Sequence, residues 1–77
     1  MSSIDDLSKL VKEVLHIEEI ENNVNLFDYG MHSLNVIQII HLIHEEFATK
    51  IELPDMFEAP TIDAIYNKIV EGKVNVN

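Results

Sequence analysis

Residues 28–47 have the sequence DYGMHSLNVIQIIHLIHEEF and hold the densest apolar periodicity in the chain. At about 100° per residue, this periodicity predicts a helix from Leu34 to Phe47 with one apolar and one mostly polar side. The side expected in the core comprises Val36, Ile37, Ile39, Ile40, Ile43 and Phe47. The opposite side comprises Leu34, Gln38, His41, Leu42 and Glu45. Other amphipathic elements must cover the apolar side, so the fold is built around this helix.

The turn that leads into this helix contains Gly30 and Ser33. Glycine adopts positive φ angles at little cost, so we expect Gly30 to use such a conformation, or to allow a close backbone approach, in the turn that presents Ser33. Ser33 falls at the N-cap or in the first turn of the helix, where free backbone amides and the helix dipole favour a phosphate group. A serine here is also an ordinary helix cap, and the two roles are compatible.

The segment before the helix, residues 17–32, lacks helical or strand periodicity. Its apolar residues stand singly among glutamates and asparagines, at Ile20, Val24, Leu26 and Phe27. We therefore predict a long ordered loop, and loops of this length in compact domains are often functional. Met31 lies at its end, where it either packs the loop against the core or contacts partner proteins.

Another amphipathic helix is predicted near the N-terminus, from Ser3 to His16. Its apolar residues recur at three- and four-residue steps and fall on one arc: Ile4, Leu7, Leu10, Val11, Val14 and Leu15. Ser2 or Ser3 can cap its first amides, and Asp5 and Asp6 lie where the positive end of the helix dipole favours anions. One face of this helix is therefore expected to be buried.

The C-terminal part predicts two further helices. Pro54 suits the first position of a short turn around residues 55–57, Pro60 ends it, and Thr61 caps a last helix. The apolar residues of that helix are Ile62, Ile65, Tyr66, Ile69 and Val70. Gly72 is placed to end it, which leaves residues 73–77 as a frayed tail. Core packing is expected for the aromatic residues Phe27, Phe47, Phe57 and Tyr66.

These elements predict an all-α fold, a four-helix bundle. It has three longer amphipathic helices, one short third helix, and a long loop between the first and second helices. Seventy-seven residues are too few for two separate cores, so residues 1–77 are expected to form a single domain with an ordered core over 3–71.

Charge and composition exclude several classes of function. Five lysines, no arginine and fourteen acidic residues give a net charge of −9, which disfavours binding to nucleic acid and to anionic membranes. Cysteine is absent, and neither a secretory signal nor a stretch of about twenty apolar residues is visible. We therefore expect a cytoplasmic protein without a membrane span. We also expect the chain to be a monomer.

The run Asp28-x-Gly30-x-x-Ser33-Leu34, with a Leu-Phe pair before it and the apolar helix after it, resembles the prosthetic-group site of acyl and peptidyl carrier proteins. The resemblance covers residues 4–70, including the long loop, the short third helix and the Pro-Thr-Ile start of the last helix. It implies that Ser33 carries a phosphopantetheine arm donated by coenzyme A. The thiol of that arm would hold an acyl or aminoacyl group as a thioester.

The same resemblance implies a non-catalytic carrier with three kinds of partner: a phosphopantetheinyl transferase, an adenylating or acyl-loading enzyme, and downstream condensing or tailoring enzymes. The Gly-x-His-Ser-Leu run is similar to the peptidyl carriers of nonribosomal synthesis, which we favour over polyketide or fatty acid carriers. Partner enzymes must approach Ser33, so we assign their contacts to the exposed side of the helix it begins, at Leu34, Gln38, His41 and Leu42. Scattered exposed leucines are also ordinary on surfaces without such a role.

Other functions for these residues have weaker support. Asp28, His32 and Ser33 are the residue types of a hydrolytic triad, but no Gly-x-Ser-x-Gly elbow is present, and adjacent residues at a helix start are poorly placed to meet. His41 and His44 lie on different parts of the helix and lack a third ligand, so no metal site is predicted. The main alternative is an acidic helical adaptor or docking domain that receives no prosthetic group.

Overall fold

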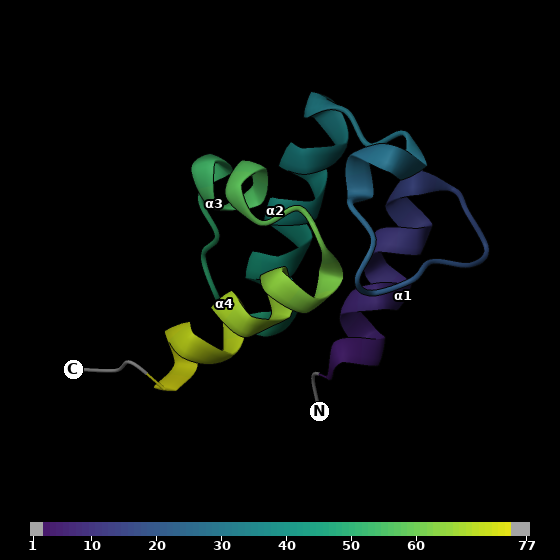
Figure 1. Cartoon of the computed structure of the whole chain (residues 1–77). Coiled ribbons are helices and arrows are strands. Elements are labelled where there is room, and N and C mark those ends of the chain that lie inside the picture. Colours follow the sequence, from purple (N-terminus) through teal and green to yellow (C-terminus); the bar gives the residue numbers. More distant parts are fainter. Residues whose placement is uncertain (1–2, 75–77) are drawn as a thin grey trace.

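The computed structural model describes residues 3–74 and contains, within them, four α-helices and one 3-10 helix. The α-helices are α1 (Ile4–Leu15), α2 (Ser33–Phe47), α3 (Leu53–Glu58) and α4 (Ile62–Val74), and the 3-10 helix η1 covers Leu26–Tyr29. Helix α1 packs against α2 and α4, α3 packs against α2, and the long loop that carries η1 joins α1 to α2 (Figure 1). No strand occurs in this part of the chain, so the predicted all-α four-helix fold is confirmed.

One apolar core joins all of these elements. Its buried side chains are Leu7, Leu10, Val11, Leu26, Met31, Val36, Ile39, Ile43, Phe47, Ile51, Met56, Ile62, Ile65 and Ile69. Among residues 3–72, whose side chains are described, no polar or charged side chain is buried. Short helices are marginal in isolation, so the six-residue α3 depends on this core for its stability. None of the described helices is both long and apolar enough to cross a membrane.

Helix α1 begins at the predicted cap. The Ser3 hydroxyl accepts a hydrogen bond from the Asp6 amide (3.3 Å), and a carboxylate oxygen of Asp6 accepts one from the Ser3 amide (3.0 Å). This reciprocal pair is a capping box, which satisfies two amides at the helix start. His16 ends the helix in a left-handed conformation. Ser2, the other predicted cap, lies outside the described residues.

Two residues of α2 lie in environments opposite to those predicted. Ile37, expected in the core, is 53% exposed, whereas Leu42, expected on the exposed side, is half-buried and packs against the core. Both side chains lie about 100° from the centre of the buried stripe, in opposite directions. The neighbouring elements therefore determine which of the two side chains is exposed. Helix α1 covers the side of α2 that carries Leu42, where Val14 and Leu42 line the same groove, and the side that carries Ile37 stays exposed.

Helix α4 begins as predicted and ends later than predicted. The Thr61 hydroxyl accepts a hydrogen bond from the amide three residues on (3.1 Å), which confirms it as the cap. Gly72 does not end the helix, which continues to Val74. A glycine inside a helix costs only about 1 kcal/mol relative to alanine, so the helix can continue through it. The first two residues of the predicted frayed tail, 73–77, are thus helical, and residues 75–77 lie outside the described residues.

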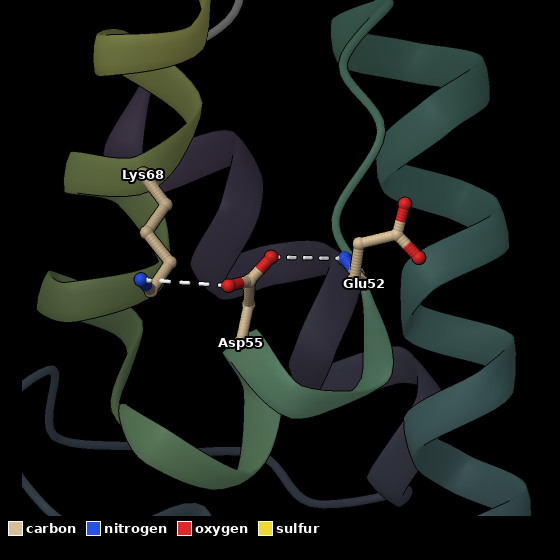
Figure 2. Close-up of polar contacts among 3 residues, drawn as sticks. All are labelled: Glu52, Asp55 and Lys68. Carbon is tan, nitrogen blue, oxygen red and sulfur yellow. Dashed lines mark hydrogen bonds and ion pairs between the residues drawn. The ribbon is translucent and has the colours of Figure 1, made fainter.

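Helix α3 is tied to α4 through Asp55. One oxygen of its carboxylate accepts a hydrogen bond from the Glu52 amide (3.1 Å), and the other lies 3.7 Å from the Lys68 ammonium nitrogen on α4 (Figure 2). Met56 is fully buried beneath the helix. Pro54 occupies the second helical position instead of the predicted first, which suits a residue without an amide hydrogen equally well.

Candidate functional site

Ser33 is the first residue of α2, and its side chain is exposed. The N-cap is His32, whose backbone is extended and whose amide donates a hydrogen bond to the side-chain oxygen of Asn35 (3.0 Å). Of the two predicted positions for Ser33, the N-cap and the first turn, the structure confirms the first turn. Within the described residues the Ser33 hydroxyl makes no hydrogen bond. Because it is also exposed, the hydroxyl is accessible to another molecule.

The turn that presents Ser33 is built by η1 and the residue that ends it. The side-chain oxygen of Asn25 accepts a hydrogen bond from the Phe27 amide (2.8 Å) and starts the 3-10 helix. Gly30 ends it with a φ of 92°, which confirms the predicted positive φ, and donates its amide to the Phe27 carbonyl (3.1 Å). Met31 is 4% exposed, and its amide donates to the Leu26 carbonyl (3.4 Å). Of the two roles left open for Met31, the structure shows packing against the core.

The long loop before α2 is fixed to the start of α4. The Leu26 amide donates to the Pro60 carbonyl (2.6 Å), and the Asp63 amide donates to the Asn22 carbonyl (3.0 Å). Within the loop, the Tyr29 hydroxyl accepts a hydrogen bond from the amide of a residue eight positions earlier (3.0 Å). These bonds satisfy backbone groups that no regular helix serves, so the loop is ordered, as predicted.

The N-terminus of α2 differs in charge from those of the other α-helices. Helices α1, α3 and α4 each carry an aspartate in the first turn, whereas α2 carries no acidic residue there. The first amides of a helix lack partners within the helix and carry the positive end of its dipole. In α2 no carboxylate of the first turn competes for these amides, so the position next to Ser33 suits a phosphate group.

The structure divides the predicted partner-binding residues into two groups. Gln38, His41 and Leu42 line a groove of about 410 Å³ between α1 and α2, together with Glu13, Val14 and His16. Leu34 does not line this groove; it is 67% exposed and lies one turn before the exposed Ile37. Leu34 follows Ser33 directly and Ile37 lies one turn further on, so these two residues give exposed apolar surface to the first turns of α2.

The residues considered for hydrolysis or metal binding are not assembled into such sites. The side chains of Asp28, His32 and Ser33 are all exposed, and no hydrogen bond joins them in the described part of the chain. His41 pairs with Glu45 at the surface, with 3.3 Å between the imidazole Nε2 and a carboxylate oxygen. Residues 3–74 contain no group of three histidine or acidic side chains that could hold a metal ion.

Three features of the site were missed in the sequence. One is the helix η1, whose only local signal is an asparagine two residues before Phe27. A second is Asn35, at the spacing at which a capping box places a glutamate or glutamine. The third is Phe57, predicted in the core but 52% exposed, whose ring stacks on that of Phe27. The other aromatic predictions agree with the structure: Phe47 is buried, and Phe27 and Tyr66 pack half-buried against the core.

Comparison with known sequences assigns this arrangement to a family. Residues 5–69 match the family described as "Phosphopantetheine attachment site". The chain is 34% identical over 67 residues to Gramicidin S synthase 2 of Brevibacillus brevis, which covers 87% of this chain and 2% of the synthase. It is 33% identical over 58 residues to Bacitracin synthase 3 of Bacillus licheniformis, which covers 75% of this chain and 1% of the synthase. The chain thus spans a small fraction of the proteins it matches.

Solved structures share the fold. One is a chain in the structure of the phosphopantetheine transferase Sfp in complex with coenzyme A and a peptidyl carrier protein, with a TM-score of 0.86, 24% identity and 91% of both chains covered. Another is a chain in the solution structure of a docking domain complex of the Pax NRPS, with a TM-score of 0.85, 28% identity, and 92% of this chain and 68% of the other covered. The match over residues 5–69 shows that this chain belongs to the phosphopantetheine attachment site family.

Proposed function

We propose that Ser33 carries the phosphopantetheine group and that the chain presents acyl or aminoacyl thioesters in nonribosomal peptide biosynthesis. The observation that carries this proposal is the exposed Ser33 at the start of α2, the α-helix whose first turn holds no acid. When attached, the group supplies the thiol that forms the thioester. The chain has no cysteine, so no thiol of its own competes for the cargo.

The residues of this chain hold and orient the modified serine without activating it. Gly30 and Met31 set the turn before the serine, through a left-handed backbone and a buried side chain respectively. The first amides of α2 favour the phosphodiester that forms on Ser33. A separate transferase with bound magnesium aligns the hydroxyl and coenzyme A, so the carrier needs no catalytic base. An adaptor without a prosthetic group would not require this arrangement.

The same proposal extends to partners and location. We assign to this chain a phosphopantetheinyl transferase, an adenylating or acyl-loading enzyme, and condensing or tailoring enzymes. Two likenesses support a peptide pathway: the chain of the Pax NRPS named above, and a dimodular nonribosomal peptide synthase of Bacillus subtilis, to which this chain is 32% identical over 66 residues. We place the chain in the cytoplasm, where coenzyme A is available, and treat residues 1–77 as one carrier domain.

Loading experiments test this function. The chain is incubated with coenzyme A, Mg²⁺ and a phosphopantetheinyl transferase, and then with ATP, amino acids and adenylating enzymes of peptide synthases. We expect one phosphopantetheine per chain, followed by an aminoacyl group that hydroxylamine removes. Loading by a malonyl transferase alone would overturn the peptide assignment. A chain that gains no mass in the first step would overturn the carrier proposal.

The two leucines assigned to partner contact should behave differently when truncated. Leu34→Ala is expected to change the free energy of unfolding by less than about 0.5 kcal/mol, because the side chain is exposed. Leu42→Ala should cost about 1–3 kcal/mol, because its side chain packs against the core. Thermal denaturation gives the stability, and the aminoacylation rate of the phosphopantetheinylated chain gives the partner effect.

We expect Leu34→Ala to slow aminoacylation several-fold. Val70→Ala serves as the matched control, because it removes an exposed apolar side chain from α4, away from Ser33. A large stability loss in Leu34→Ala would place that residue in the core. Aminoacylation at the unsubstituted rate with every loading enzyme would move the interface elsewhere.

A further inference from the structure

Phe57 on α3 and Phe27 in η1 form an aromatic stack between two elements that are far apart in the sequence. Their ring centroids are 5.7 Å apart, and the ring planes differ by 8°. This separation lies within the range of about 4.5–7 Å in which offset aromatic pairs attract one another. Phe57 remains 52% exposed in the stack, so its ring covers Phe27 without filling the core.

A second contact joins the same two segments. The Leu26 amide donates a hydrogen bond to the carbonyl of Pro60, three residues after Phe57 (2.6 Å). Residues 57–60 therefore hold the first half of η1 through one ring contact and one backbone hydrogen bond. Both contacts act on the first two residues of η1, Leu26 and Phe27.

Helix η1 in turn fixes the backbone that leads to the serine. The Phe27 carbonyl accepts the Gly30 amide (3.1 Å), and the Leu26 carbonyl accepts the Met31 amide (3.4 Å). A shift of Phe27 moves the acceptor for Gly30, and Gly30 is the left-handed residue on which the direction of the turn depends. Two backbone hydrogen bonds therefore link η1 to Gly30 and Met31, and Ser33 follows Met31 by two residues.

Helix α3 provides a fixed support for this path. Met56 anchors it in the core with no exposed surface. Asp55 binds the Glu52 amide at the start of α3 and pairs with Lys68 of α4, as Figure 2 shows. Phe57 directly follows Met56, so its ring extends from a helix that is held both by the core and by the ion pair with α4.

We propose that Phe57 is a positioning residue for the modification of Ser33: its ring, stacked on Phe27, holds η1 and the turn at Gly30 so that the hydroxyl meets the transferase in one orientation. The inference rests on the proposed role of Ser33 as the attachment site. Phe57 acts through Phe27 in this account and not by touching the transferase.

Hydrogen exchange in the unmodified full chain tests the coupling without any partner enzyme. Phe57→Leu removes the ring and keeps an apolar side chain, so the fold should persist. We expect the amides of Gly30 and Met31 to exchange about two- to tenfold faster in this variant, as the loss of one aromatic pair implies. Leu53→Ala is the matched control: it trims another exposed apolar side chain of α3, and it should leave both amides unchanged.

A double-mutant cycle then separates positioning from direct contact. Phe27→Leu and Phe57→Leu should each lower kcat/KM for the transferase about two- to tenfold. If Phe57 acts through the Phe27 ring, its replacement adds no further loss in the Phe27→Leu background. If the two losses in kcat/KM multiply in the double variant, Phe57 contacts the transferase directly and the inference is wrong. The inference is also wrong if Phe57→Leu leaves the exchange of the Gly30 and Met31 amides unchanged while the wild-type chain is modified at Ser33. A wild-type chain that is never modified would overturn the proposed function itself.

Discussion

Replacing Ser33 with alanine is expected to abolish phosphopantetheine transfer and to leave the fold intact. The hydroxyl is the proposed acceptor, so the variant has no atom to which the group can be attached. The Ser33 side chain is exposed and makes no hydrogen bond within the described residues, and the N-cap is His32. The free energy of unfolding should therefore change by no more than about 0.5 kcal/mol. Intact-mass analysis after incubation with transferase and coenzyme A, with a thermal melt of the same sample, measures both.

Ser8→Ala is the matched control for this experiment. Ser8 lies on α1, away from the motif, so this variant should gain one phosphopantetheine at the wild-type rate. Modification that persists in Ser33→Ala, or that maps to Ser3 or Ser8, would show that the acceptor lies elsewhere.

Gly30→Val is expected to slow modification about tenfold or more while retaining most of the helix content. The φ of 92° at Gly30 is strained for any residue with a Cβ atom, and most for a β-branched one. No atom lies within 4 Å of an added Cβ, so the cost comes from backbone conformation alone, at about 1–3 kcal/mol. The turn relieves this strain by moving, which displaces Ser33. Transferase kinetics and circular dichroism measure the two effects.

Gly30→Asn separates strain from other causes in this prediction. Asparagine tolerates the left-handed region better than valine or alanine, so the modification rate should fall in the order glycine, asparagine, alanine, valine. A valine variant modified at the wild-type rate would show that the turn does not position the serine. Equal losses in all three variants would mean that the transferase rejects any side chain at this place.

Most of the helical structure could be predicted from the sequence, because local signals determine it. The three- and four-residue steps of α1 and α2 and the caps at Ser3 and Thr61 all agree with the structure. The environments of Ile37 and Leu42 could not be predicted, because a helical wheel gives each residue's direction but not which neighbouring helix covers it. The end of α4 could not be predicted for a different reason: glycine is a common stop signal, but a helix can continue through Gly72 at a cost of only about 1 kcal/mol.

The candidate site was visible in the sequence as a motif and a turn. The positive φ of Gly30 followed from the residue type, and the position of Ser33 followed from the apolar helix after it. The contacts that brace the turn were not visible, because they join segments distant in the sequence. The stack of Phe27 on Phe57 and the hydrogen bond to Pro60 both depend on how α3 packs, which no local pattern reports.

The mass of one peptide from the native protein tests the central claim most directly. Trypsin cleaves after Lys12 and Lys50, and residues 13–50 contain Ser33 as their only serine. In protein isolated from its native cell, we predict this peptide to carry the added mass of phosphopantetheine, alone or with an acyl or aminoacyl group, and fragmentation should place the addition on Ser33. A peptide found only at the mass calculated from its residues, in cells whose other carrier proteins are modified, would contradict the carrier assignment.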